Sequence, residues 1–273
     1  MNEDDEALIR IGDELAGILV EHGLTPDNSV LDVGCGYGRL ALGILHATNH
    51  RGPYLGFDIL RRQIEWCRAT ITPAFPNVRF VHVDVRNARY NPHGTLEATE
   101  AMFPVRSGAT DLCALFSVFT HFYRADIDRY LSEIRRVLRP GGVAVTTWFL
   151  LDAARIPLAA AADAMYPMVH TLDATARYAD ATDPLRAIAY DEAAVREAVA
   201  AARLELVEVV RGTWAGEPGR TVQDIVVLRR SVSDTTIDPG PKRPGIGART
   251  RPVIARVRRL PRGVVRRVRR RLS

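Results

Sequence analysis

The sequence has few cysteines, and none of them lies in a metal-binding or disulfide pattern. The 273 residues include only three, Cys35, Cys67 and Cys113, and no C-x-x-C pair occurs. A zinc site or a disulfide framework is therefore not indicated, and a reducing compartment is expected. Clusters of Asp and His that would suggest another bound metal are also missing, so we expect no metal.

Long apolar runs are missing as well. No stretch approaches the ~20 apolar residues that a membrane-spanning helix needs. The acidic start of the sequence, MNEDDEALIR, has no apolar core of a secretory signal, so we expect a cytoplasmic protein. Apolar residues make up 47% and charged residues 25% of the chain, which is typical of a globular protein with a substantial core. The length favours one domain with appendages.

Charge is distributed unevenly along the chain. Residues 231–273 contain thirteen Lys or Arg and two Asp, which gives this segment a net charge of +11. Because the whole chain carries +5, residues 1–230 carry −6. Residues 231–252 are rich in Pro, Gly and small polar residues, and we predict that they form a disordered linker between a folded domain and a basic tail.

The basic tail, residues 253–273, combines arginines with an apolar stripe at helical spacing. We predict an amphipathic helix on an anionic membrane surface, at the inner face of the membrane, where each cation contributes ~1 kcal/mol. Pro261 interrupts the helical pattern. The tail has no aromatic residue to stack on bases, so a nucleic-acid partner is less favoured. Nonspecific RNA contact and a solvated tail remain alternatives. The stripe consists of Val253, Val257, Leu260, Val264, Val268 and Leu272.

A glycine-rich turn between a strand and a helix is the most informative part of the sequence. Residues 29–41 read SVLDVGCGYGRLA, an apolar strand followed by three glycines and a helix that opens at Arg39. Glycine permits backbone angles that bring main-chain N–H groups against a ligand. The helix N-terminus adds partial positive charge. This pattern predicts a nucleotide pocket at the carboxyl edge of a parallel sheet.

The glycine spacing does not match a dinucleotide fingerprint. That pattern, G-x-G-x-x-G/A, requires a small residue where this chain has Arg39. The run is D-x-G-x-G-x-G, in which Asp32 suits a cationic ligand and would repel a phosphate. It resembles motif I of class I S-adenosylmethionine (SAM)-dependent methyltransferases. The resemblance implies SAM as cofactor and S-adenosyl-L-homocysteine as product.

Two further acids follow Asp32 at equal spacing. Asp58 ends a predicted strand over residues 54–59, and Asp84 lies near the end of another over residues 78–85, so each acid follows the previous one by 26 positions. An acid at the tip of the second strand can accept both ribose hydroxyls. By the same resemblance, Asp84 accepts the adenine amino group and the N–H of Val85 reads the adenine ring.

The resemblance extends over roughly residues 25–150. It includes the segment after a predicted strand at 111–118 and the LRPGG turn at 138–142. It implies an α/β fold, a Rossmann-like seven-stranded, mostly parallel sheet with an antiparallel last strand and helices on both faces, within a domain of residues 1–230. The implied cofactor-binding residues are Asp32, Gly34, Cys35, Gly36, Gly38, Asp58, Asp84, Val85, Phe116 and Ser117.

Residues 152–185 exceed what the minimal fold needs. We interpret them as an inserted cap over an acceptor pocket, with a mere surface excursion as the alternative. His121, just after the strand at 111–118, is the candidate base that takes a proton from an acceptor hydroxyl. Weaker candidates for contact with the acceptor are Tyr123, Trp148, Tyr166 and His170.

The sequence leaves three hypotheses about function. Several segments, among them SVFTH at 117–121 and AIAYDE at 187–192, resemble a bacterial subset of this superfamily that often accompanies glycan or cell-envelope biosynthesis. The first hypothesis is therefore a SAM-dependent methyltransferase acting on a hydroxyl of a sugar, a glycan or another small metabolite in cell-envelope biosynthesis. The second is an RNA- or protein-directed methyltransferase that uses the Arg-rich tail. The third is a noncatalytic SAM-binding scaffold. No Asn-Pro-Pro-Tyr-type segment follows the strand at 111–118, which disfavours amino methylation of nucleic acid. The sequence does not specify an oligomeric state.

Overall fold

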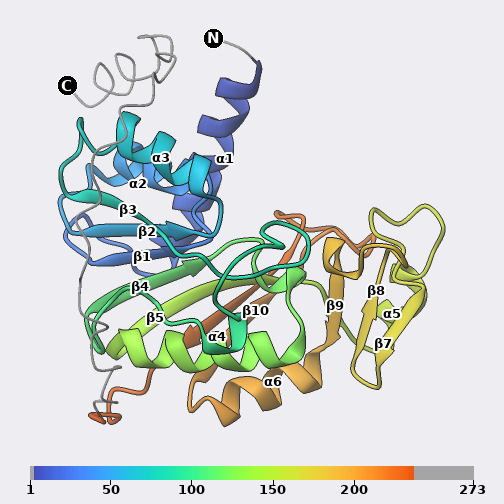
Figure 1. The fold of residues 1–273 in the computed structure, drawn as a ribbon. Coiled ribbons are helices and arrows are strands. Elements are labelled where there is room, and N and C mark those ends of the chain that lie inside the picture. Colours follow the sequence, from blue (N-terminus) through green and yellow to red (C-terminus); the bar gives the residue numbers. More distant parts are fainter. Residues whose placement is uncertain (1–2, 237–273) are drawn as a thin grey trace.

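The computed structural model describes residues 3–236, with side chains from Ile9 onward, and a seven-stranded sheet forms its centre (Figure 1). The strand order is β10-β11-β5-β4-β1-β2-β3. Strand β11 runs antiparallel to both of its neighbours, whereas the pairs from β5 to β3 are parallel. The predicted Rossmann-like sheet with a reversed last strand is confirmed. Its strands are β1 (Val30–Val33), β2 (Tyr54–Asp58), β3 (Val78–His82), β4 (Thr110–Leu115), β5 (Leu138–Trp148), β10 (Glu205–Val210) and β11 (Asp224–Arg229).

Helices cover both faces of this sheet. Figure 1 shows α1, α2 and α3 on one face and α4 and α6 on the other. Their bounds are α1 (Glu3–Glu21), α2 (Arg39–Thr48), α3 (Arg61–Thr70), α4 (Arg124–Val137) and α6 (Glu192–Ala201). Helix α1 precedes β1, whereas α2, α3, α4 and α6 each lie between two strands along the chain, as an alternating pattern of strands and helices predicts.

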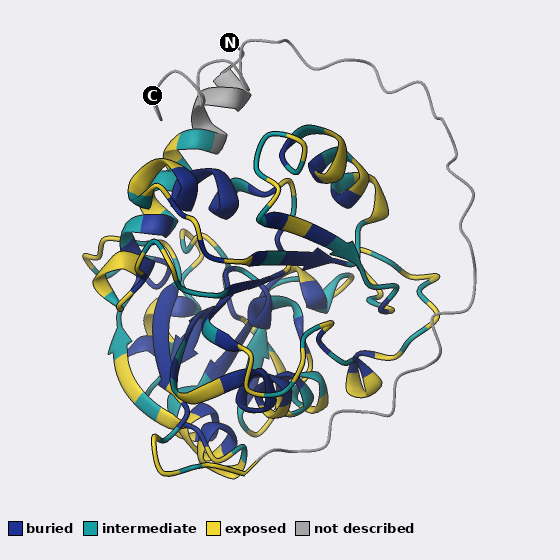
Figure 2. Cartoon of the chain, turned by 90° about the vertical axis from the view of Figure 1, so that its left-hand side faces the viewer, coloured by how far each residue is buried: buried dark blue, intermediate teal, exposed yellow. Residues whose placement is uncertain are grey.

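The central strands are apolar on both faces because each face carries its own core. Along β4, Leu112 and Ala114 belong to the cluster under α1 to α3, whereas Cys113 and Leu115 belong to the cluster under α4 and α6. Figure 2 shows the central strands almost entirely buried. A parallel strand with helices on both sides has no solvent-facing side, which explains the unbroken apolar run in the sequence.

Some element boundaries differ from the sequence prediction. Strand β3 ends at His82, so Asp84 follows the strand instead of closing it. Helix α4 begins at Arg124, and the carboxylate of Asp126 accepts a hydrogen bond from the Tyr123 N–H at 3.3 Å, so Asp126 caps the helix from within its first turn. The predicted LRPGG turn forms the first residues of β5.

The predicted insertion is part of a second, four-stranded sheet of order β6-β9-β8-β7. This sheet includes residues on both sides of 152–185, because β6 and β9 are its first two strands. Helix α5 (Arg155–Ala159) follows β6, and η3 (Pro184–Arg186), a single 3-10 turn, lies between β8 and β9. The strands are β6 (Leu150–Leu151), β7 (His170–Asp173), β8 (Ala176–Tyr178) and β9 (Ile188–Asp191). We call residues 150–191 the insert.

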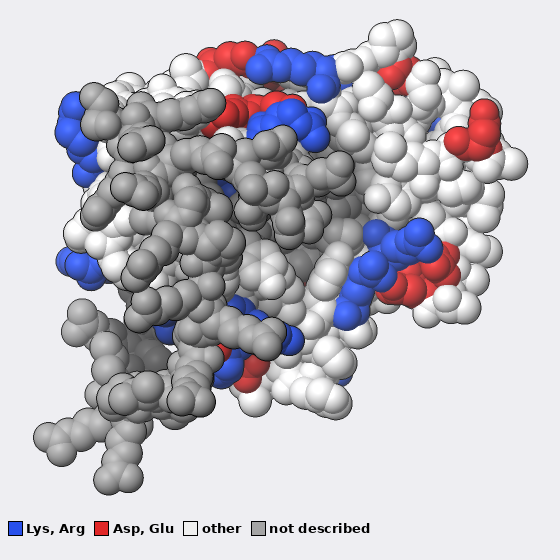
Figure 3. All heavy atoms as spheres, turned by 90° about the horizontal axis from the view of Figure 1, so that it is seen from above, with Lys and Arg blue, Asp and Glu red and all other residues white. Residues whose placement is uncertain are grey.

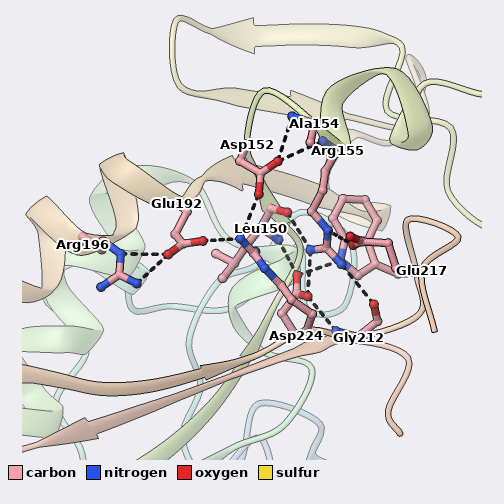
Figure 4. A network of polar contacts seen from close by, with 11 residues as sticks. Leu150, Asp152, Ala154, Arg155, Glu192, Arg196, Gly212, Glu217 and Asp224 are labelled. Carbon is pink, nitrogen blue, oxygen red and sulfur yellow. Dashed lines mark hydrogen bonds and ion pairs between the residues drawn. The ribbon is translucent and has the colours of Figure 1, made fainter. Parts of the chain in front are cut away.

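A buried ion pair fastens the insert to the central sheet (Figure 4). Arg155, only 1% exposed, donates to Asp224 Oδ1 at 2.8 Å and to the carbonyls of Leu150 and Gly212, each at 3.0 Å. Asp224, 0% exposed, also accepts from the Leu150 and Gly212 N–H groups at 2.8 Å and from Trp214 Nε1 at 2.7 Å. Both charges are therefore fully hydrogen-bonded, which a buried ion pair requires to be tolerated.

A second set of charges links the insert to α6. Arg211 donates to Asp152 at 2.9 Å and is also bonded to Glu192, whose carboxylate pairs in turn with Arg196 at 2.6 Å. Figure 4 shows this chain continuing from the buried pair. The insert thus packs as part of the domain.

The start of the predicted linker packs on the domain. Asp234 forms an ion pair with Arg135 at 2.7 Å, and Arg230 donates to the carbonyls of Asp234 and Thr236. Despite burial, hydrogen bonds from Thr236 and the nearby arginines lower the pKa of Asp234 to about 2. Residues 231–236 are therefore held in place, which differs from the prediction. The rest of the predicted linker and the basic tail 253–273 lie outside the described residues.

Candidate active site

A cavity of about 370 Å³ lies at the carboxyl ends of β1, β2 and β4. Its volume is within the roughly 300–1,000 Å³ of small-molecule sites, and its place is where open α/β sheets bind ligands. Among its lining residues are six predicted for the cofactor and the predicted base. These seven are Gly34, Cys35, Gly36, Asp58, Phe116, Ser117 and His121.

The glycine turn shapes one wall of the cavity. Gly34 and Gly36 both have positive φ, 73° and 56°, and both line the cavity. A Cβ on Gly34 would lie 2.8 Å from Val118 Cγ2, so only glycine fits there. Gly38 serves a different purpose, because a Cβ there would lie 2.7 Å from Ile71. It lies outside the lining residues and allows the close packing of α2.

Asp58 ties the glycine turn to the end of β2. Its Oδ2 accepts from the Gly36 N–H and its Oδ1 from the Leu60 N–H, both at 2.8 Å. Burial raises the pKa of Asp58, although these hydrogen bonds favour the charged form. Each carboxylate oxygen keeps a lone pair, so this side chain can still accept hydroxyl groups of a ligand in the cavity.

Asp32 lies beneath the glycine turn. It is 3% exposed and accepts a hydrogen bond from the Tyr54 hydroxyl. Burial raises the pKa of Asp32 to about 7, against the lowering effect of that hydrogen bond. Asp32 is not among the lining residues, so the structure places this predicted cofactor ligand below the cavity wall.

Asp84 and Val85 also lie outside the cavity lining. The carboxylate of Asp84 accepts from Asn91 Nδ2 and Thr95 Oγ1, both at 3.0 Å, and these bonds lower its pKa. Val85 is 2% exposed and packs in the core. Because β3 ends at His82, Asp84 and Val85 lie at the start of the long connection that follows the strand, and the hydrogen bonds of Asp84 stay within that connection.

The opposite wall follows β4, where Ser117 has a φ of 60° although it is not glycine. Its N–H donates to Thr147 Oγ1 at 2.7 Å, and its hydroxyl donates to Gln223 Oε1 at 3.0 Å. Backbone strain of this kind persists where the surroundings impose it, commonly at functional sites. Thr147 and Gln223 come from β5 and the residue before β11, and nothing in the sequence indicated this role.

His121 ends η2 (Phe119–His121) and contributes a neutral imidazole to the cavity wall. Its Nδ1 lies 2.8 Å from the Leu185 carbonyl, which can only accept, so Nδ1 carries the proton and Nε2 keeps a lone pair. The Tyr90 hydroxyl lies 3.4 Å from Nε2. Burial lowers the pKa of His121, and the nearby Arg89 lowers it further, whereas the carbonyl contact raises it. The predicted base is therefore oriented and uncharged at neutral pH.

The four predicted acceptor contacts lie in different places. Tyr123 lines a second groove next to the cavity. Trp148 is 1% exposed, stacks on Phe119 with ring centroids 4.2 Å apart and donates to Thr146, so it is a core residue. Within the insert, His170 packs on Tyr178, and Tyr166 packs on Phe149 just before the insert. These last three predicted residues do not line the cavity or the groove.

Tyr90 lines both the cavity and the groove and was not among the predicted site residues. It lies in the long polar connection at 86–108, which has no hydrophobic periodicity to place its side chains. Within residues 3–236 no group of three or more His, Cys, Asp or Glu is arranged to hold a metal ion. In the same range, no helix combines the length and the apolar character that crossing a membrane requires.

Comparisons with known proteins agree with this geometry. Residues 30–142 match the family model described as "Methyltransferase domain". A probable S-adenosylmethionine-dependent methyltransferase of Mycolicibacterium smegmatis is 33% identical over 114 residues, 42% of this chain and 35% of that protein. Phthiotriol/phenolphthiotriol dimycocerosates methyltransferase 1 of Mycobacterium ulcerans is 30% identical over 118 residues, 43% of this chain and 36% of that protein. The chain thus matches only about a third of the length of these relatives.

A solved structure extends the similarity to the fold as a whole. Burkholderia thailandensis 1,6-didemethyltoxoflavin-N1-methyltransferase, with 1,6-didemethyltoxoflavin and S-adenosylhomocysteine bound, superposes with a TM-score of 0.52. The match covers 84% of this chain and 80% of that one at 19% identity. At this identity the similarity speaks for the fold alone.

Proposed function

We propose that this protein transfers a methyl group from SAM to a hydroxyl of a sugar, a glycan or another small metabolite, because residues 30–142 match a methyltransferase-domain model and form part of a sheet of the class I SAM-dependent methyltransferase type. The observation that carries the proposal is the oriented, neutral His121 in the wall of the cavity that Gly34, Gly36 and Asp58 form. A hydroxyl nucleophile needs such a base, because its proton leaves as the new bond forms.

The residues around the cavity fit SAM. Gly34 and Gly36 leave room where a Cβ would otherwise project, and Asp58 has lone pairs for ribose hydroxyls. Phe116 and Ser117 supply main chain on the opposite wall. When bound, SAM supplies an electrophilic methyl group on a positively charged sulfur.

His121 would remove the acceptor proton at Nε2. The Leu185 carbonyl keeps the proton on Nδ1, so the lone pair stays at Nε2, beside the hydroxyl of the cavity-lining Tyr90. After proton transfer the same carbonyl stabilises the Nδ1–H of the imidazolium. A positioned base of this kind contributes about 10²–10⁴-fold to the rate.

The substrate class is inferred from the names of related proteins and from the surface charge. The name of the Mycobacterium ulcerans relative contains a triol, which favours a hydroxyl acceptor. The Burkholderia neighbour is named for methylation at nitrogen, so the fold alone does not select the nucleophile. On the face in Figure 3, most visible arginines among the described residues lie beside acidic side chains. The visible part of this face thus offers little unpaired basic surface for the RNA-directed alternative.

Incubation of the full chain with labelled SAM and separate lipid, glycan and RNA fractions tests the proposal. We expect label in the glycan or glycolipid fraction. His121→Gln should lower kcat by about 10²–10⁴-fold and leave S-adenosylhomocysteine affinity, measured by calorimetry, unchanged. Label in RNA alone would favour the RNA-directed alternative. Tight SAM binding with no labelled product in any fraction would favour the scaffold.

We also propose a peripheral position at the inner face of the membrane, in the cytoplasm, through residues 253–273. The support is the +11 charge of residues 231–273. Cosedimentation of the full chain with vesicles tests it: binding to vesicles containing phosphatidylserine should weaken as salt rises, and neutral vesicles should not bind. Equal binding to both vesicle types would contradict an electrostatic attachment.

A further inference from the structure

A groove of about 530 Å³ adjoins the cavity, and Tyr90 lines both. One side of the groove is the connection after β3, which carries Arg89 and Tyr90. The other side is the insert, which contributes Asp183 and Leu185, and Tyr123 lies at the start of α4. The groove therefore exists only because the insert packs against the central domain.

A series of contacts that begins and ends in the insert lines the boundary between the groove and the cavity. Asp183 forms an ion pair with Arg89, and the Arg89 guanidinium lies 5.2 Å from the centre of the Tyr90 ring. The Tyr90 hydroxyl lies 3.4 Å from His121 Nε2, and His121 Nδ1 returns to the insert at the Leu185 carbonyl, 2.8 Å away. The insert thus contacts Arg89 through Asp183 and His121 through the Leu185 carbonyl.

The side chains of the groove suit a neutral ring that bears several hydroxyl groups. Tyr90 and Tyr123 are 39% and 40% exposed, and flat half-exposed aromatic rings can pack on the C–H face of such a ring. The Arg89 and Asp183 side chains, 31% and 34% exposed, supply donors and acceptors side by side. An anionic ligand would meet Asp183, and a cationic one would meet Arg89, so this pair disfavours both.

The contact between Tyr90 and His121 is long. An oxygen donor commonly lies 2.5–3.0 Å from its acceptor, so a separation of 3.4 Å describes a weak bond that another hydroxyl can replace. Tyr90 also lies where the groove meets the cavity. A ring seated in the groove would present one of its hydroxyls at the position that the Tyr90 hydroxyl occupies.

We propose that this groove binds a neutral polyhydroxylated ring of the methyl acceptor, and that Tyr90 is a positioning residue that yields its place at His121 Nε2 to the acceptor hydroxyl. The proposal rests on the function proposed above, because it assumes that the cavity holds SAM. It adds a site and a ligand class, and it identifies Arg89, Asp183, Tyr90 and Tyr123 as determinants of acceptor specificity.

Binding of sugar probes to the full chain tests the groove. Saturation-transfer NMR in the presence of S-adenosylhomocysteine would use methyl glucoside, methyl mannoside and methyl rhamnoside as probes, with glucose 6-phosphate and glucosamine as charged comparisons. We expect transfer to at least one neutral glycoside and weaker transfer to the charged compounds. Tyr123→Ala and Asp183→Asn should each weaken probe binding at least tenfold. Arg51→Met, in an exposed pair with Asp27, is the matched control and should leave binding unchanged.

A spectroscopic measurement tests the role of Tyr90. The ¹⁵N resonance of His121 Nε2 should shift when the probe binds to the wild type. In Tyr90→Phe it should differ before probe addition and reach the same bound position, because the acceptor hydroxyl replaces that of Tyr90. Asp183→Asn keeps the size of the side chain, so its effect does not depend on misfolding.

The outcomes separate this inference from the proposed function. If S-adenosylhomocysteine binds but no neutral glycoside shows transfer, or if Tyr123→Ala and Asp183→Asn bind the probe as the wild type does, the groove is not the acceptor site. An Nε2 resonance that the probe leaves unchanged would overturn the role of Tyr90. Failure of the wild type to bind S-adenosylhomocysteine would instead refute the proposed function itself.

Discussion

Replacement of Arg155 by methionine removes one half of the buried ion pair that fastens the insert. Asp224 would keep three donors, the N–H groups of Leu150 and Gly212 and the indole of Trp214, but lose its charged partner. The carbonyls of Leu150 and Gly212 would each lose a donor in the core. Methionine retains much of the volume, so the loss is mainly electrostatic.

The expected cost follows from these contacts. Removal of one partner of a buried pair costs about 3–5 kcal/mol, because the other charge stays buried without compensation. For a domain of this size that corresponds to a decrease in Tm of roughly 6–20 °C. Urea denaturation of the wild type and Arg155→Met measures the free energy of unfolding directly. The double variant Arg155→Met/Asp224→Asn should not recover the loss fully, because both Asp224 oxygens accept from N–H donors and an amide nitrogen in place of either oxygen would face those donors.

Arg51→Met provides the matched control. Arg51 and Asp27 form a pair of the same chemistry at 3.0 Å, with side chains 66% and 71% exposed. Exposed pairs contribute about 0–1 kcal/mol, so this variant should unfold almost as the wild type does. If Arg155→Met also costs less than about 1 kcal/mol, the buried pair does not hold the insert, and the reasoning from burial is refuted.

Three further predictions concern the cavity and the chain beyond β11. Asp58→Ala should weaken S-adenosylhomocysteine binding at least tenfold, about 1.4 kcal/mol, whereas Asp84→Ala, outside the lining, should weaken it less; calorimetry compares the two. Because burial lowers the pKa of His121, kcat/KM should stay level at neutral pH and fall only as the pH drops through a value below 6.5; a midpoint at or above 7 would contradict the assigned base. The pKa of Asp234 is lowered to about 2 from an ordinary 3.8, so its stabilising charge is present above pH 4 and is lost as the pH falls through 2. Calorimetry should therefore find Asp234→Asn less stable than the wild type at pH 7, with the gap closing near pH 2.

The insert connects stability to the chemistry at His121. The Leu185 carbonyl, which sets the tautomer of this histidine, lies on η3 within the insert. The buried pair at Arg155 fixes the other end of the same segment. A variant that loosens the insert should therefore alter proton transfer at His121 more than it alters cofactor affinity, because Gly34, Gly36 and Asp58 belong to the central domain.

Much of the cavity at the glycine turn could be predicted because its signals are local. The glycine turn, the strand before it and the helix after it follow one another in the chain, and backbone sterics favour glycine at the positive φ of Gly34. The order of alternating strands and helices likewise predicts the parallel sheet, since crossover connections allow few topologies. Six of the ten predicted cofactor residues line the cavity for this reason.

The acceptor side depends on contacts between distant segments. Trp148, predicted as an acceptor contact, is the last residue of β5, but its side chain is buried in the core. Asp84 has the expected spacing, yet the early end of β3 leaves its carboxylate bound to Asn91 and Thr95. The spacing of acids in a sequence does not predict the residue at which a strand ends.

By itself, the sequence determined a SAM-type turn, a parallel sheet and a charge imbalance, because propensity, periodicity and glycine sterics act over a few residues. Only the tertiary structure decided that Leu185 meets His121 across 64 positions, or that Asp183 meets Arg89 beside Tyr90. Such long-range contacts form because the insert is buried against the domain, where many weak interactions together select one arrangement. No short segment contains that information, because the free energy that fixes it is shared by the whole core.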